Sequence, residues 1–231
     1  MDTLPALTSQ RILDDSMTIL QAHIPLQARG YRCQTADLWR VLLAATAQHR
    51  SIEAACADLD GVPHANTIRG YLTQQWQPDQ LPMLQQQCNA ALHAALPDWL
   101  TAQPQEIAID THDMPFYGQV RDTAAEAWVC GGKAKASTSW HYRCATATVL
   151  TRNARLTIAL MFVPPGTAMD VIVTQLLATI QASGITIGCL YADRGFATVA
   201  VLQHLQHAQI PAIIALAQRG PRLRTHCQGQ E

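Results

Sequence analysis

Two short apolar runs, each ending on an aspartate, constrain this chain more than any other feature. The first is Ile107-Ala108-Ile109-Asp110, and the second is Leu190-Tyr191-Ala192-Asp193, which Arg-Gly-Phe follows. Runs of this length and composition are typical of buried β-strands. Strands lying side by side would bring the two carboxylates together, and paired carboxylates suit Mg²⁺ at a phosphoryl-transfer site. The alternative is that each aspartate caps the turn after its strand.

The composition excludes several classes of protein. The formal net charge is −1, so any contact with DNA must come from local groups of cations rather than from overall charge. The seven cysteines include no Cys-x-x-Cys pair, which argues against a zinc ribbon or a secreted disulfide framework and for a reducing cytoplasm. The sequence shows neither a signal pattern nor an apolar run of transmembrane length, so it predicts a cytoplasmic protein without a membrane partner.

The first part of the chain, residues 1–104, has a helical pattern and is expected to form a DNA-binding region with a connector. Hydrophobic spacing and turn residues predict five helices, at about 4–29, 35–49, 52–59, 65–74 and 81–96. The second to fourth of these, with Gly61 in the turn before the last, predict a helix-turn-helix over about 35–75.

The last helix of this arrangement supplies the candidate DNA contacts. Its inward positions are apolar, which leaves Asn66 and Arg69 facing outward, where they can contact bases or phosphates of double-stranded DNA. An ordinary three-helix packing unit with a polar outer face explains the same pattern, and the sequence leaves both interpretations open.

From residue 105 the pattern changes to strands. Strands are expected at 107–110, 142–150, 155–163, 185–193 and 212–217, with helices at 169–182 and 198–207. The largely apolar third strand is expected to be central. Residues 111–137 are interpreted as a long polar loop, where Lys133 and Lys135 beside a glycine pair either contact phosphate or are merely solvated.

The order β-β-β-α-β-α-β predicts a fold of the α/β class. It consists of an N-terminal helix-turn-helix-like region followed, over 105–231, by a ribonuclease H-like mixed sheet with flanking helices. In that order the first strand is central and the fourth pairs beside it. This adjacency would bring Asp110 and Asp193 together.

The sequence resembles the DDE transposases of bacterial and archaeal insertion sequences. The resemblance rests on Ala108-Ile109-Asp110-Thr111-His112-Asp113-Met114-Pro115-Phe116-Tyr117-Gly118, on Lys133 and Lys135 with His141-Tyr142-Arg143-Cys144-Ala145-Thr146, and on Tyr191-Ala192-Asp193-Arg194-Gly195-Phe196. It implies that Asp110 and Asp193 are catalytic metal ligands for two Mg²⁺ ions, with Mn²⁺ as a substitute. It also implies DNA cleavage and strand transfer at element ends, a homodimer in a synaptic complex, and a prokaryotic, nucleoid-associated location.

The resemblance implies a third acidic residue, a Glu on a later helix. The only acidic residue after Asp193 is Glu231, in a segment without helical periodicity. The expectation is therefore an incomplete core that ends before this helix, an N-terminal portion of a longer transposase that is inactive by itself. Two alternatives stay open: a non-catalytic DNA-binding protein that occupies element ends, and an unrelated metal-dependent nuclease.

Four residues near the two aspartates have expected roles, and among them His112 and Asp113 are second-rank site candidates. Arg194 would orient the Asp193 carboxylate or hold DNA. His112 shares a face with Asp110 if the strand continues, and it either touches metal or phosphate or is a polar neighbour. Asp113 is expected to shape a turn before Met-Pro, and Gly195 to allow a sharp change from strand to helix.

Overall fold

The computed structural model describes residues 8–120, 127–135, 137–152 and 154–216. Contacts divide the chain into two compact units, Met1–Ala95 and Leu96–Glu231, called unit 1 and unit 2 below. The boundary predicted between residues 104 and 105 lies a short way inside unit 2. Each unit is described by itself.

Unit 1 is helical, as the spacing predicts. Its elements are α1 (Ser9–His23), β1 (Arg29–Gly30), β2 (Cys33–Gln34), α2 (Thr35–Ala47), α3 (Ile52–Asp58), α4 (Ala65–Gln75), the 3₁₀ turn η1 (Pro78–Gln80) and α5 (Leu81–Ala94). The first helix is shorter than expected, because Thr8 caps it and the chain is extended beyond His23. The part of that prediction before residue 8 lies outside the described residues.

Helices α2, α3 and α4 surround one apolar cluster. Leu38 and Val41 of α2 and Ile68 of α4 are fully buried in it. The Ser51 hydroxyl accepts a hydrogen bond from the Ala54 amide at 3.2 Å and so begins α3. Gly61 has a φ of 71°, a left-handed conformation that glycine adopts without strain, and it turns the chain toward α4.

The β1–β2 hairpin before α2 was not predicted. Its two strands are two residues each, too short to show an alternating pattern. Arg29 pairs with Gln34 and Gly30 with Cys33, so Tyr31 and Arg32 form the turn.

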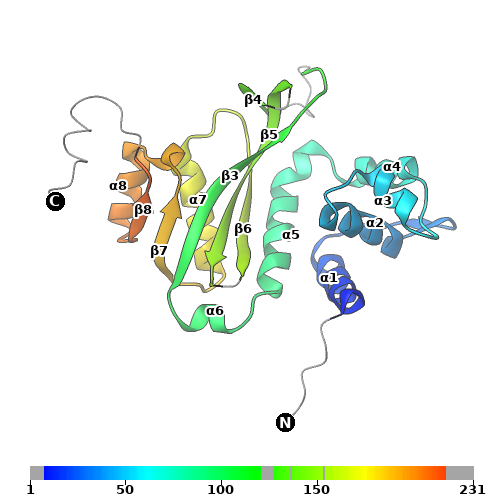
Figure 1. The fold of residues 1–231 in the computed structure, drawn as a ribbon, viewed down its shortest axis with the longest axis horizontal. Coiled ribbons are helices and arrows are strands. Elements are labelled where there is room, and N and C mark those ends of the chain that lie inside the picture. Colours follow the sequence, from blue (N-terminus) through cyan, green and yellow to red (C-terminus); the bar gives the residue numbers. More distant parts are fainter. Residues whose placement is uncertain (1–7, 121–126, 136, 153, 217–231) are drawn as a thin grey trace, which may run out of the picture. The chain divides into compact units, whose positions relative to one another are not determined.

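Unit 2 contains a six-stranded mixed sheet (Figure 1). Its elements are α6 (Trp99–Ala102), β3 (Gln105–Pro115), β4 (Val129–Lys135), β5 (Thr138–Leu150), β6 (Arg155–Val163), α7 (Met169–Ala182), β7 (Ile187–Ala192), the 3₁₀ turn η2 (Arg194–Phe196), α8 (Val199–His207) and β8 (Ala212–Ile214). The strand order is β4-β5-β3-β7-β8, and β6 also pairs with β5. The predicted α/β class and the central position of the first strand are confirmed.

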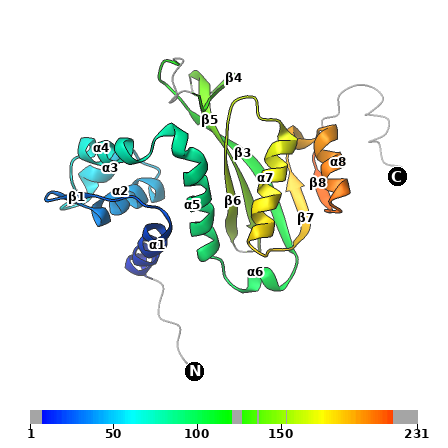
Figure 2. The same ribbon diagram turned by 180° about the vertical axis from the view of Figure 1, so that it is seen from behind.

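Helices α7 and α8 cover one face of this sheet, which both views show (Figures 1 and 2). Ile107 and Ile109 of β3 point into the resulting core, whereas the alternating neighbour Asp110 is exposed. Helix α7 contributes Ile172, Leu176 and other buried residues at helical spacing. Strand alternation therefore places Asp110 on the face opposite the core.

Two predictions about the sheet were wrong. Residues 111–137 are not one loop, because β3 continues to Pro115 by pairing with β5, and Val129–Lys135 forms the strand β4. Strand β6 is not central: among the described strands it pairs with β5 alone. Its apolar residues are explained by the packing of its inner face against the core that α7 covers.

No helix in the described parts of the chain is both long and apolar enough to cross a membrane.

Candidate metal and nucleic-acid site

Asp110 and Asp193 occupy equivalent positions where the pairing between two neighbouring strands ends. Strands β3 and β7 run parallel, and Ile109 pairs with Ala192 as their last register pair. Neighbouring strands lie about 4.8 Å apart. Asp110 and Asp193 are the next residues along each strand, and both are exposed. The parallel adjacency expected from the order of elements thus brings the two aspartates side by side, where the pairing of β3 with β7 ends.

Both carboxylates also make local hydrogen bonds. The Asp193 Oδ1 atom accepts from the Gly195 amide at 2.8 Å and so caps the turn η2. Asp110 Oδ1 accepts from the Thr111 amide at 2.7 Å. The capping role that the sequence left open is therefore present at Asp193, through one of its two oxygens.

Gly195 serves a different purpose from the one expected. Its φ is not in the left-handed region. Instead, a Cβ atom at this position would lie 3.0 Å from Asp193 Oδ1. The missing side chain lets the carboxylate approach the backbone.

His112 lies on the same face as Asp110, because β3 continues past both and side chains alternate along it. Its Nε2 atom is 3.1 Å from the Thr146 hydroxyl on β5. Thr146 is also the residue that pairs with Asp110 across the two strands. Thr146 was not predicted to be a site residue, although the alternation of the second predicted strand could have placed it there.

Asp113 does not shape a turn, contrary to expectation. It lies within β3 on the face opposite Asp110, where its carboxylate accepts from Arg143 Nε at 2.8 Å and lies 3.3 Å from His141 Nε2. The side chains of Asp113 and His141 are only 14% and 8% exposed. The hydrogen bond to Asp113 is the main cause that raises the pKa of the Arg143 guanidinium. Asp113 therefore stabilises the pairing of β3 with β5.

The segment that carries Lys133 and Lys135, predicted to be a loop, forms the strand β4 instead. Lys133 is exposed on it, and the backbone of Lys135 pairs with Thr138, while the Lys135 side chain lies outside the described residues. The neighbouring glycines do not form a flexible pair. A Cβ atom at Gly132 would lie 2.7 Å from Cε1 of the buried His141 ring, so a glycine is needed for β4 to pass this ring.

Arg194 directly follows Asp193 and begins η2. Its side chain is exposed. A guanidinium at this place can reach a phosphate near the two carboxylates.

The two aspartates where the β3–β7 pairing ends meet part of what a hard divalent cation needs. Asp110 and Asp193 supply oxygen ligands, the kind that Mg²⁺ prefers. Within the described residues there is no group of three His, Cys, Asp or Glu side chains that could hold a metal ion. Glu231, the acidic residue that follows Asp193 in the sequence, lies outside them.

The candidate DNA-binding residues of α4 are exposed, as predicted, but they are engaged with each other and with α3. Arg69 Nη1 donates to Asn66 Oδ1 at 3.2 Å. The same guanidinium forms an ion pair with Glu53, whose carboxylate offsets its charge. Any contact between Arg69 and a phosphate has to compete with this ion pair.

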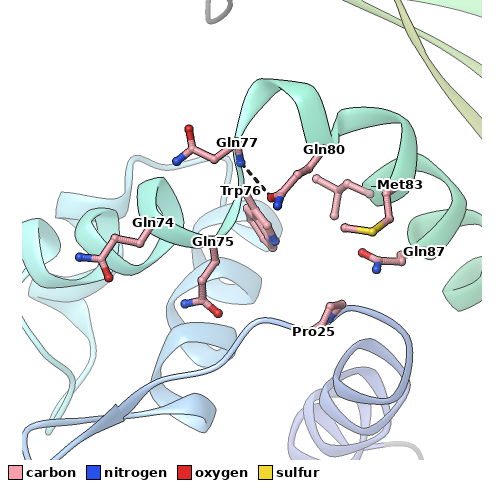
Figure 3. Close-up of a pocket in the computed structure, with 9 residues that line it drawn as sticks. Pro25, Gln74, Gln75, Trp76, Gln77, Gln80, Met83 and Gln87 are labelled. Atoms are coloured by element: carbon pink, nitrogen blue, oxygen red, sulfur yellow. Dashed lines mark hydrogen bonds between the residues drawn. The ribbon is translucent and has the colours of Figure 1, made fainter.

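A hollow in unit 1 lies where α4 meets η1 and α5. Its volume is about 270 Å³, and its lining consists mainly of glutamine amides around one indole: Pro25, Gln74, Gln75, Trp76, Gln77, Gln80, Met83, Leu84 and Gln87 (Figure 3). Figure 3 shows Gln75 extending from α4 toward the segment that carries Pro25. Some of these side chains already make hydrogen bonds within unit 1; for example, Gln80 Oε1 accepts from the backbone N–H of Gln77 at 3.2 Å.

The fold is similar to that of a piggyBac transposase, seen by cryo-EM in a synaptic complex with hairpin DNA. The TM-score is 0.50 and the sequence identity is 11%. The similarity covers 96% of this chain and 52% of that chain, so this chain spans about half the length of the piggyBac chain. No family model and no curated protein matches the sequence. At this identity the likeness establishes a transposase-like fold and nothing finer.

Proposed function

We propose that this protein is a DNA transposase of the insertion-sequence kind, which cleaves and joins DNA at element ends with metal ions held at Asp110 and Asp193. The observation that carries the proposal is their placement directly after the last register pair of two parallel strands. The similarity in fold to a transposase supports it. We further propose that it acts as a homodimer on double-stranded DNA in the cytoplasm, associated with the nucleoid.

The residues around Asp110 and Asp193 have distinct roles in this proposal. Asp110 and Asp193 would hold Mg²⁺ or Mn²⁺, and such ions supply positive charge to phosphate oxygens and lower the pKa of bound water. The exposed Arg194 would bind a phosphate beside them. His112, bonded to Thr146, would stand next to the reacting phosphate as a hydrogen-bond donor.

A third acidic ligand would have to come from outside the described residues. With two carboxylates alone, the site stabilises less of the charge that develops in the transition state, and such a loss commonly lowers rates by orders of magnitude. We therefore propose that residues 1–231 bind metal weakly and do not cleave DNA without a further ligand.

The second candidate is a DNA-binding protein without catalysis. It is favoured by one specific observation, the use of Asp193 Oδ1 as the cap of η2. In this case the aspartate has a structural role, and the helices α2 to α4 carry the function.

Binding of Mn²⁺ separates the two candidates. We would titrate the purified protein with Mn²⁺ and follow free Mn²⁺ by electron paramagnetic resonance. Asp110→Asn and Asp193→Asn should each lower the affinity at least tenfold, because each removes one charged oxygen ligand from the site. Asp98→Asn is the matched control, since Asp98 is exposed in unit 2 and makes no capping hydrogen bond.

Equal Mn²⁺ affinity in all three variants and the unsubstituted protein would rule out the metal site and leave the second candidate. Cleavage of element-end DNA by residues 1–231 that disappears in Asp193→Asn would show that the site has all its ligands. The proposed lack of activity would then be wrong, whereas the assignment of the two aspartates would stand.

A further inference from the structure

Unit 1 holds six basic side chains that carry a permanent charge, and all are arginines. Four of them form ion pairs within the unit: Arg11 with Asp15, Arg40 with Asp37, Arg50 with Asp58 and Arg69 with Glu53. The other two, Arg29 and Arg32, have no carboxylate partner among the residues that the structure describes. Both belong to the β1–β2 hairpin, so the uncompensated positive charge of unit 1 is concentrated there.

The tip of this hairpin, residues 29–32, presents three exposed side chains. Arg29 and Arg32 are exposed, and Tyr31 between them is 101% exposed. Within the described parts of the chain, the Arg29 guanidinium donates one hydrogen bond, to the neutral amide oxygen of Gln27 at 3.0 Å, which leaves its charge uncompensated. In both views the hairpin projects from the helices of unit 1 (Figures 1 and 2).

The hairpin is fixed to α4 at two points, although its strands are short. The Gln75 side chain donates to the Gln27 carbonyl at 2.7 Å and accepts from the Gln27 amide at 2.8 Å. Gly30 packs so closely on α4 that a Cβ atom there would lie 2.8 Å from the Tyr71 hydroxyl oxygen. Because the hairpin is held in place, less conformational entropy is lost when its exposed side chains bind a partner.

We propose that the hairpin tip is a contact surface for the phosphate backbone of duplex DNA, with Arg29 and Arg32 bound to phosphates and Tyr31 against the sugar-phosphate chain. Arginine guanidinium groups bind phosphate with two parallel hydrogen bonds, and tyrosine hydroxyls also donate to phosphate oxygens. Contacts of this type position a protein on a duplex without reading its sequence. The inference rests on the proposed function, because it assumes that the partner of unit 1 is DNA.

The test is the salt dependence of binding to a fluorescein-labelled random-sequence duplex of about three helical turns. Binding is followed by fluorescence anisotropy at several salt concentrations. The double variant Arg29→Gln/Arg32→Gln should lower the slope of log K against log salt by about 1.8, since each phosphate contact contributes about 0.9. Tyr31→Ala should weaken binding severalfold at low salt and leave the slope unchanged.

The matched control is Arg11→Gln/Arg50→Gln, which removes two charges from arginines that are already paired with carboxylates. This variant should keep the slope of the unsubstituted protein. Circular dichroism checks that all variants keep their helices, and all four positions are exposed.

Three outcomes would overturn the inference. If the unsubstituted protein binds the duplex and both double variants give its slope, the hairpin does not touch DNA, while the proposed function is unharmed. If the two double variants lower the slope equally, the effect is one of overall charge and the hairpin has no special role. If the unsubstituted protein binds no duplex at low salt, the DNA-binding part of the proposed function falls together with the inference.

Discussion

Asp110 and Asp113 lie three residues apart on β3, and the structure gives them opposite roles. Asp113 contacts Arg143 and His141 and is largely buried, whereas Asp110 is exposed where the pairing of β3 with β7 ends. Replacing each by alanine in turn should therefore separate folding from function. Asp113→Ala should destabilise unit 2, and Asp110→Ala should leave its stability nearly unchanged and weaken metal binding at least tenfold.

The size of the first effect follows from the exposure of the partners. Removal of one member of a buried ion pair costs about 3–5 kcal/mol, and a hydrogen bond to a charged group contributes about 1.5–3 kcal/mol. The Arg143 side chain is 27% exposed, so water can hydrate its guanidinium once Asp113 is removed. The cost should therefore lie near the lower end of these two ranges. We expect Asp113→Ala to lower the free energy of unfolding by about 2–3 kcal/mol. The exposed Asp110 should change it by less than about 0.5 kcal/mol.

Urea unfolding followed by far-UV circular dichroism measures both values. With a slope of about 2 kcal/mol per molar urea, the Asp113→Ala midpoint should fall by about 1–1.5 M, and the Asp110→Ala midpoint by less than about 0.25 M. Hydrogen exchange of β3 amides assigns the transition to unit 2. Equal midpoints for the two variants would refute the assignment of Asp113 to the stability of the sheet.

Two further predictions concern close contacts. Gly132→Ala should lower the free energy of unfolding by about 1–3 kcal/mol in urea unfolding, because its Cβ would lie 2.7 Å from the His141 ring. Gly70→Ala in the middle of α4 should instead be neutral or stabilising, because its Cβ would meet no atom within 4 Å outside the backbone of its own helix. Tyr191 donates to Glu106, which raises the pKa of its hydroxyl to about 12. The stability that this bond contributes is present below the ordinary tyrosine pKa of about 10 and is lost as pH rises through about 12. Glu106→Gln should lower the pKa of Tyr191, so that its hydroxyl ionises at a lower pH in an ultraviolet titration.

The sequence was most informative where a pattern is long and one face is buried. Helix α7 was predicted with its observed bounds, since its apolar residues repeat at helical spacing between a Pro-Pro-Gly break and a Ser-Gly end. The parallel pairing of β3 with β7 followed from the order of elements, because short crossovers leave few topologies. These two features suffice to place Asp110 beside Asp193.

The sequence misled where pairing, not periodicity, makes a strand. The end of β3 and much of β4 are rich in polar residues and glycines, which resemble a loop until β5 provides backbone partners for both strands. Likewise the hairpin of residues 29–34 has no hydrophobic signal, and the segment that leads into it is held by hydrogen bonds between Gln27 and Gln75 of α4, 48 residues apart in sequence. Contacts of this length cannot be read from a local window.

The Gln75 side chain binds both backbone groups of Gln27, as a neighbouring β-strand would. A primary amide offers one donor and one acceptor side by side, the same pair that an extended backbone presents, and Gln27 is bound by both. A glutamate has no donor for the carbonyl, and an asparagine is one methylene shorter. The chain segment that leads into the hairpin is thus held by the chemistry and length of one side chain, while the close packing of Gly30 on Tyr71 holds the hairpin itself.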